Sequence, residues 1–225
     1  MTNQNVHKQI TISTSRSQYE VGGSIPLNIS YLNPGEGKLT FRDPARTWEV
    51  KLAVWCQSTG EMQVPFGRKF FYQGENYQRI SIEDADEISL NPGQRHTFEP
   101  DIGKRWVGLF PPGQLTVRIV DESDDSETVT SNSIELHIIF TPNSFVSLLN
   151  IVPDNDYSLD SRMFATHWVG QLYPGFRVYL QEPTEAQEAG NRRMVQDARN
   201  WWATNQQNPE VLKKIAEINM AAESR

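Results

Sequence analysis

Polar and apolar residues alternate along most of the first 141 residues, and a period of two is typical of strands with one buried face. The clearest case is residues 25–31, where Ile25, Leu27 and Ile29 fall on the same side. The same alternation predicts strands at 9–15, 39–42, 47–56, 80–82, 88–90, 97–99, 115–120 and 134–140. Such a series of short strands, separated by turns, is typical of a β-sandwich.

Two stretches lack this alternation. Residues 19–23 contain a glycine pair and are predicted to form a turn. Residues 58–76 are rich in aromatic side chains without a period, which fits either a long connection or two short edge strands.

After Thr141-Pro142 the apolar residues recur three and four positions apart, which predicts helices. The first helix is capped by Thr141 or Asn143 and ends at Pro153, and a second begins at Ser158. Thr184 and Gln187 have the spacing of a capping box for a third helix reaching about residue 205. Asn208 followed by Pro209 starts a fourth. We therefore expect sheets at 9–141 and a small helical subdomain at 142–225, packed on them.

Composition limits the environment in which the chain works. With 225 residues and one cysteine, the chain is long enough to bury a core, and it cannot form an internal disulfide. Residues 1–14 do not resemble a secretory leader, and the longest apolar-leaning run, 145–152, is too short to cross a bilayer. These features predict a cytoplasmic protein without a membrane segment.

The formal net charge of -7 argues against a nucleic-acid surface, because phosphate binding depends on clustered lysine and arginine. Neither the strand-rich part nor the helical part is basic. An acidic protein instead attracts a basic protein partner.

Residues with catalytic or metal-binding chemistry are scattered. His7, His96, His137 and His167 lack the spacing that presents metal ligands on one face, so no metal is expected. Cys56 falls on the apolar side of its strand, which predicts a buried thiol. Neither a nucleophile elbow nor a glycine-rich phosphate loop is present in the sequence. We therefore expect a protein that is not an enzyme and needs no cofactor.

Two acidic clusters are candidate partner-binding loops. They consist of Glu83, Asp84, Asp86 and Glu87, and of Asp121, Glu122, Asp124, Asp125 and Glu127. The second cluster lacks the glycine and the terminal glutamate of an EF-hand calcium loop. Each cluster is explained either as a solvated hairpin tip or, if the two loops form one negative rim, as a surface that steers a basic ligand.

Adjacent tryptophans form a second candidate for partner binding. Trp201 and Trp202 lie in the third predicted helix, where neighbouring side chains point about 100° apart. At most one of them can face the core fully. The other is a candidate interface anchor, since tryptophan is frequent among residues that dominate binding energy.

Part of the chain resembles a known family. The residues concerned are 47–50, Leu90-Asn-Pro-Gly93, Phe98, Trp106 and Pro111-Pro-Gly113-Gln-Leu-Thr-Val117. They resemble the bacterial immunoglobulin-like domains typified by the intracellular proteinase inhibitor (BsuPI-like) family, with Leu115 in place of the expected tyrosine. The resemblance implies an antiparallel immunoglobulin-like β-sandwich at 9–141, in a protein that is mainly β with α, and it suggests protease inhibition.

Together these features predict a cytoplasmic, non-catalytic protein-binding protein. We expect an inhibitor or antagonist of the immunity-protein type, a monomer or dimer that neutralises a toxin or enzyme by direct binding. Three alternatives remain open: an intracellular protease inhibitor, a structural adaptor that oligomerises, and an enzyme whose site the sequence does not reveal.

Overall fold

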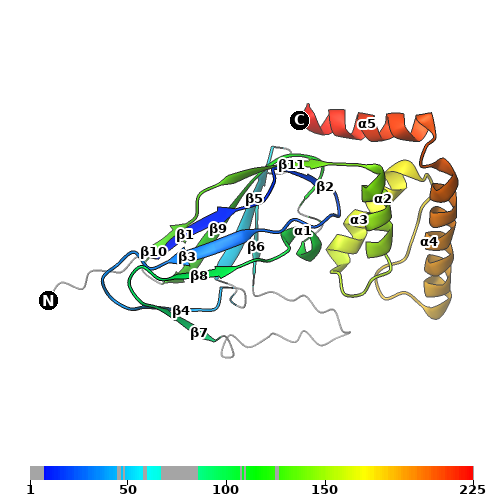
Figure 1. Ribbon diagram of the computed structural model, residues 1–225. Helices are drawn as coiled ribbons and strands as arrows, with labels where there is room; N and C mark the ends of the chain where they lie inside the picture. The colour runs from blue at the N-terminus through cyan, green and yellow to red at the C-terminus, as the bar shows by residue number, and fades with distance from the viewer. Residues whose placement is uncertain are drawn as a thin grey trace.

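The computed structural model describes residues 8–44, 47, 49–57, 60–66, 86–106, 108, 110–124 and 127–224. Their architecture is α+β, with strands in the first part of the chain and the longer helices in the second (Figure 1). The strand predicted at 80–82 lies outside the described residues.

The strands form a smaller sheet, a larger sheet and a separate two-stranded ribbon. The smaller sheet has the order β1 (Gln9–Ser13), β3 (Asn28–Leu32), β8 (Arg95–Phe98). The larger sheet has the order β2 (Gln18–Glu20), β11 (Ile134–Ile139), β9 (Gly113–Asp124), β5 (Val50–Cys56), β6 (Gly60–Pro65), and β10 (Glu127–Thr130) also pairs with β9. A separate ribbon joins β4 (Leu39–Arg42) to β7 (Glu87–Leu90).

The predicted alternation decides which side chains form the core. On β5, Val50, Leu52 and Val54 are buried, whereas Lys51 and Trp55 lie on the other face. The inward residues of β1, β3, β9 and β11 belong to the same hydrophobic cluster. Burial of such side chains is the main favourable term for folding.

Three short elements differ from the sequence predictions. Residues 18–20, placed partly in a turn, form β2, which runs parallel to β11, so the prediction of an entirely antiparallel arrangement is wrong at this strand. A short helix, α1 (Ile102–Arg105), was not predicted. Within residues 58–76, for which a connection or two edge strands remained open, β6 is a strand, and residues 67–76 lie outside the described residues. The elements β2 and α1 have only three and four residues, which is too short to show a period.

A side-chain amide ties β1 to the larger sheet. Ile12 N donates to Asn132 Oδ1 at 2.8 Å, and Asn132 Nδ2 donates to Ile12 O at 3.0 Å. The amide therefore satisfies the backbone of β1 as a neighbouring strand would. Asn132 lies in the connection between β10 and β11, so this contact links the two sheets.

The helices begin where their capping residues predict. They are α2 (Pro142–Ile151), α3 (Leu159–Leu172), α4 (Glu185–Asn205) and α5 (Pro209–Glu223). Thr141, Ser158, Thr184 and Asn208 each accept a backbone N–H in the first turn. These contacts satisfy donors that would otherwise lack partners.

The last helix, α5, reaches back across the ends of β11 and β9 (Figure 1). Phe140 N donates to Asn219 Oδ1 at 2.8 Å, and Asn219 Nδ2 donates to Phe140 O at 2.9 Å. Gly113 lies directly under Ala222, where a Cβ on the glycine would approach within 3.4 Å of the Ala222 carbonyl oxygen. The helical part is thus attached to the sheets by specific hydrogen bonds as well as by apolar packing.

Replacing Asn219 with alanine should lower the free energy of unfolding by about 1–3 kcal/mol, because both backbone groups of buried Phe140 lose their partner. Urea denaturation followed by circular dichroism measures this change. Asn143→Ala is the control, since Asn143 is exposed in the first turn of α2, and it should change the value by less than about 0.5 kcal/mol. Equal stability of the two variants would contradict the role of this contact.

Candidate functional site

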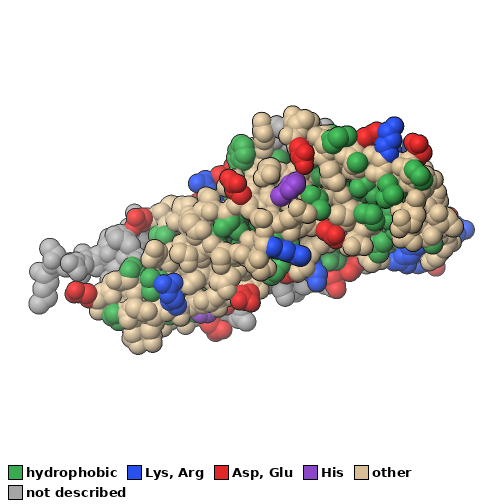
Figure 2. Space-filling view, turned by 45° about the horizontal axis from the view of Figure 1, so that its top comes forward, with side chains coloured by type: hydrophobic (Ala, Val, Ile, Leu, Met, Phe, Trp, Pro, Cys, Tyr) green, Lys and Arg blue, Asp and Glu red, His purple; other side chains and the backbone are tan. Residues whose placement is uncertain are grey.

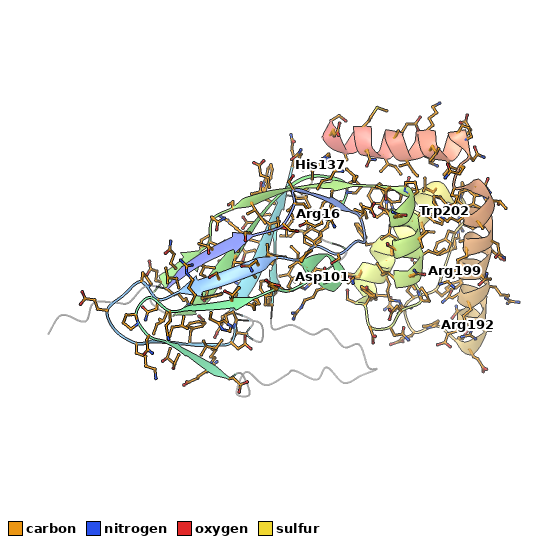
Figure 3. All side chains as sticks on the ribbon, in the orientation of Figure 1. Arg16, Asp101, His137, Arg192, Arg199 and Trp202 are labelled. Atoms are coloured by element: carbon orange, nitrogen blue, oxygen red, sulfur yellow. The ribbon has the colours of Figure 1, made fainter. Side chains whose placement is uncertain are left out.

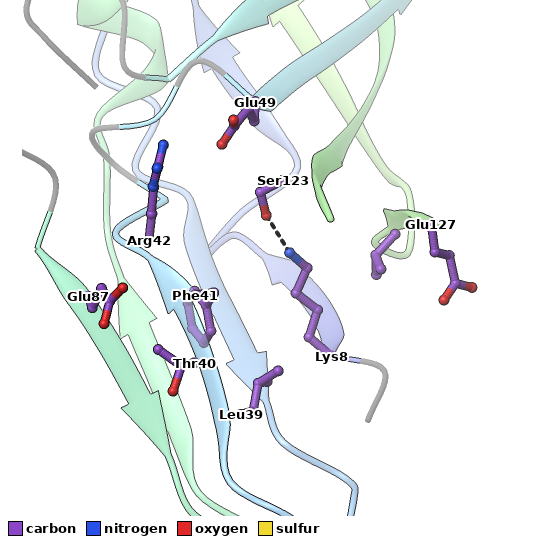
Figure 4. Close-up of a pocket in the computed structure, with 10 residues that line it drawn as sticks. Lys8, Leu39, Thr40, Phe41, Arg42, Glu49, Glu87, Ser123 and Glu127 are labelled. Atoms are coloured by element: carbon purple, nitrogen blue, oxygen red, sulfur yellow. Dashed lines mark hydrogen bonds between the residues drawn. The ribbon is translucent and has the colours of Figure 1, made fainter. Parts of the chain in front are cut away.

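An open cavity of about 520 Å³ lies between the β4–β7 ribbon and the β9–β10 hairpin (Figure 4). Its lining consists of Lys8, Leu39, Thr40, Phe41, Arg42, Glu49, Glu87, Ser123, Glu127 and Val129. Five of these side chains are charged, and they come from segments far apart in the sequence. This concentration of charge makes the cavity the candidate functional site.

Strand register sets the wall formed by the ribbon. Arg42 lies opposite Glu87, and Phe41 lies opposite Ile88. The Phe41 ring is stacked on Tyr31 of β3 with the ring centroids 5.1 Å apart. Aromatic stacking therefore fixes the ribbon to the smaller sheet.

The opposite wall comes from the hairpin. Strand β9 continues past its pairing with β5 and turns back as β10, with an irregular register between Glu127 and Val129. This hairpin carries Ser123, Glu127 and Val129 to the cavity. The paired part of this hairpin therefore borders the site, whereas residues 125 and 126 at its tip lie outside the described residues.

A buried ion pair supports this wall. Lys8 Nζ lies 2.8 Å from Asp121 Oδ1, and the two side chains are only 7% and 1% exposed. Lys8 Nζ also donates to Ser123 Oγ at 2.6 Å, drawn as a dashed line in Figure 4. Asp121 Oδ1 accepts two further hydrogen bonds, from Ser123 N at 2.9 Å and Ser123 Oγ at 2.6 Å. These contacts offset the cost of removing both charges from water.

Tyr31, whose ring stacks on that of the lining residue Phe41, has a buried hydroxyl group. Burial raises the pKa of Tyr31 well above its ordinary value, and the negative charge of Asp121 raises this pKa further. Tyr31 therefore remains neutral at physiological pH.

The charges on the lining leave a negative excess. The lining carries three carboxylates, of Glu49, Glu87 and Glu127, and two cations, Arg42 and Lys8, of which Lys8 is paired with Asp121. In Figure 4 the Arg42 side chain extends between the positions of Glu49 and Glu87. No ion pair joins these three side chains to one another in the described part of the chain. The cavity is therefore better suited to a cation than to an anion.

The structure brings parts of both predicted acidic clusters together. Glu87, from the first cluster, and Glu127, from the second, line the same cavity. Glu122, another member of the second cluster, is exposed and pairs with Lys51 at 2.6 Å. Exposed Asp86 directly precedes β7. One carboxylate from each predicted cluster therefore lies on the same cavity.

Asp121, which was predicted to belong to the negative rim, does not lie on it. It is 1% exposed and paired with Lys8, so it supports the wall and presents no charge to solvent. Glu83, Asp84 and Asp125 lie outside the described residues, as does the side chain of Asp124.

The two tryptophans differ in their surroundings. Trp202 is 6% exposed and stacks on Phe145 of α2 with ring centroids 4.4 Å apart (Figure 3). Trp202 is therefore a core residue, not an interface anchor. Trp201 is only partly buried and its ring lies 5.1 Å from that of Tyr173.

Other exposed apolar side chains were not selected from the sequence. Trp55 is 46% exposed on the outer face of β5, a position that the alternation of its strand had already placed opposite the core residues. The helices also expose apolar side chains, and Figure 2 shows hydrophobic groups gathered over the helical end. None of these exposed apolar residues lines the cavity.

Cys56 and the histidines that the structure describes, His96, His137 and His167, do not line the cavity. Cys56 is buried on the core face of β5, which confirms the predicted buried thiol. His137 Nε2 lies 3.8 Å from Glu223 Oε1 under α5. Within the described residues, no three histidine, cysteine, aspartate or glutamate side chains are placed to hold a metal ion. Nor does any helix there combine the length and apolar character needed to cross a membrane.

Comparison with known proteins gives only distant likenesses. No protein-family model matches the chain, and no curated protein matches it. Among solved structures, Spo0M, a sporulation control protein from Bacillus subtilis, is 10% identical with a TM-score of 0.35, over 64% of this chain and 54% of that one. A β-glucosidase from Erythrobacter marinus is 11% identical with a TM-score of 0.35, over 59% of this chain and 15% of that one.

The DNA glycosylase AlkC of Pseudomonas fluorescens, bound to DNA containing an abasic site analogue, is 14% identical with a TM-score of 0.34, over 58% of this chain and 30% of that one. The chain therefore spans from about a seventh to about half of the length of these three structures. Likeness at this level assigns no activity.

Replacing Lys8 with methionine should lower the free energy of unfolding by about 3 kcal/mol or more, because it leaves Asp121 charged and buried without its cation. Combining Lys8→Met with Asp121→Asn should recover part of this loss, since the double variant buries no charge. Urea denaturation of both variants tests the pair.

Lys104→Met provides the control, because Lys104 is 63% exposed and its pair with Asp101 spans 3.8 Å, so its loss should cost at most about 1 kcal/mol. If Lys8→Met were no more harmful than Lys104→Met, the buried pair would not support the cavity wall.

Proposed function

We propose that the protein is a non-catalytic, cytoplasmic protein-binding protein that antagonises a basic toxin or enzyme by direct contact, as an immunity protein does. The observation that carries this proposal is the placement of Glu87 and Glu127, from two separate acidic segments, on one cavity. A surface of this kind recognises a positively charged partner without any catalytic geometry.

Electrostatic attraction supports this function on two length scales. The formal net charge of -7 draws a basic partner toward the molecule from a distance. At the surface, the carboxylates of the cavity then favour one orientation of the partner over others. Both effects weaken as salt shortens the range of the interaction, to about 8 Å at physiological ionic strength.

We propose in addition that the smaller and the larger sheet form an immunoglobulin-like β-sandwich, which is the fold that the family resemblance implies. Gly93 and Gly113, the glycines of the two turns on which the resemblance rests, have positive φ values of 75° and 126°. Trp106 is 7% exposed, as expected for a core residue of such a domain. Loops and hairpins at the ends of a β-sandwich are frequent binding surfaces.

The double variant Glu87→Gln, Glu127→Gln should lose a basic partner that the wild-type protein captures from lysate of the source cells. The lost carboxylates slow association, so the on-rate measured by surface plasmon resonance at low salt should fall severalfold, with a smaller change in the off-rate. The control variant Glu135→Gln, Glu217→Gln removes the same charge from exposed positions away from the cavity. A captured partner that binds wild type and both variants equally fast would contradict the proposal.

An antagonist of this type should also be a monomer or dimer when alone. Light scattering at increasing protein concentration measures the mass, and adding the captured partner should produce a single stoichiometric complex. A higher oligomer of the isolated protein would instead favour a structural adaptor that assembles through its sheet edges or helices.

A further inference from the structure

We propose that the cavity between the β4–β7 ribbon and the β9–β10 hairpin is a receptor for one arginine side chain. This inference rests on the proposed function and specifies the chemistry of the partner: a protein that presents an exposed arginine. The volume of about 520 Å³ is within the range of about 300–1,000 Å³ that is common for small-ligand pockets.

The lining suits both parts of an arginine side chain. Leu39, Phe41 and Val129 contribute the smaller, apolar part of a mainly polar lining, against which a three-carbon stem can pack. Glu49 and Glu87 supply carboxylates, and neither carboxylate is committed to an ion pair with another described residue. A guanidinium group matches carboxylates through paired N–H donors, and it holds its charge at any physiological pH.

The other charged residues of the cavity explain why a cation is preferred over an anion. The positive charge of Lys8 is compensated by Asp121, whose Oδ1 lies 2.8 Å from Lys8 Nζ. Arg42 is the remaining cation on the lining, and it lies opposite Glu87 in the β4–β7 register. A guest guanidinium is therefore attracted by Glu49 and Glu87 and repelled by Arg42.

These opposite contributions give variants with effects of opposite sign. Glu49→Gln and Glu87→Gln should each weaken arginine binding by roughly two- to fivefold, the effect of losing one exposed charge pair. Arg42→Gln should instead tighten binding by a similar factor, because it removes a like charge from the site. A side chain that only maintained the fold would not change affinity in this signed pattern.

The probe is N-acetyl-L-arginine amide, titrated into the full-length, isotope-labelled protein and followed by amide chemical shifts in NMR. We expect saturable shifts for residues of the lining, strongest in Arg42→Gln, and unchanged affinity in the control Glu135→Gln. N-acetyl-L-citrulline amide, which has nearly the same shape without the charge, should cause no saturable shift. N-acetyl-L-lysine amide should bind more weakly than the arginine compound, since a point charge engages the carboxylates less well.

Equal binding of the citrulline compound, equal or tighter binding of the lysine compound, or weaker binding in Arg42→Gln would overturn the arginine site. Failure of this site is distinguishable from failure of the proposed function. The association of a captured basic partner can depend on Glu87 and Glu127 while the arginine probe does not bind. That result contradicts the arginine site and agrees with the proposed antagonist function. If the probe binds but no basic partner is captured, the proposed antagonist function is contradicted and the arginine site is kept.

Discussion

The pairing of β5 with β9 is the interaction on which the rest of the structure depends. Its register places Leu52 opposite Ile119 and Val54 opposite Val117, and all four side chains are fully buried. Strand β9 also pairs with β11 and β10, and its start contacts α5. A slip of one residue in this pairing would turn every core side chain of the strand toward solvent, so the hydrophobic pattern itself holds the register.

The same register accounts for the position of the candidate site. Val50, at the start of β5, lies opposite Asp121 of β9, so the core ends where the buried charge begins. Beyond this point Glu122 N still donates to Glu49 O at 3.0 Å, and β9 continues into the hairpin with β10 that forms one wall of the cavity. The Lys8–Asp121 pair closes the end of the core with a polar contact. The cavity is thus a consequence of where apolar pairing stops along one strand.

Local pattern predicted the elements that repeat a period or carry a cap. Strand β4 was predicted with its observed bounds, and the four capping residues marked the starts of the long helices. The pattern failed at β2 and α1, which are stabilised by contacts with β11 and by the Asp101 cap over too few residues to repeat. Local pattern also failed to predict that Asp121 is buried, because a charged residue is expected at the surface unless it is paired.

The partner of Asp121 is Lys8, which is 113 positions away in the sequence, and no local rule reveals it. The same holds for Arg42 and Glu49, which become site residues only when the ribbon and β5 are placed in space.

Two asparagine side chains connect separate parts of the molecule, and asparagine is open to slow hydrolysis of its amide. Asn132 and Asn219 each offer one N–H and one C=O to the backbone of a distant segment. Spontaneous deamidation would replace the donating nitrogen with a second oxygen, setting a negative charge against the carbonyl of Ile12 or Phe140. Deamidation of one side chain would then weaken the contact between two parts of the molecule without any change in the hydrophobic core. The working lifetime of the protein is therefore tied to how well its fold shields these two groups from hydrolysis.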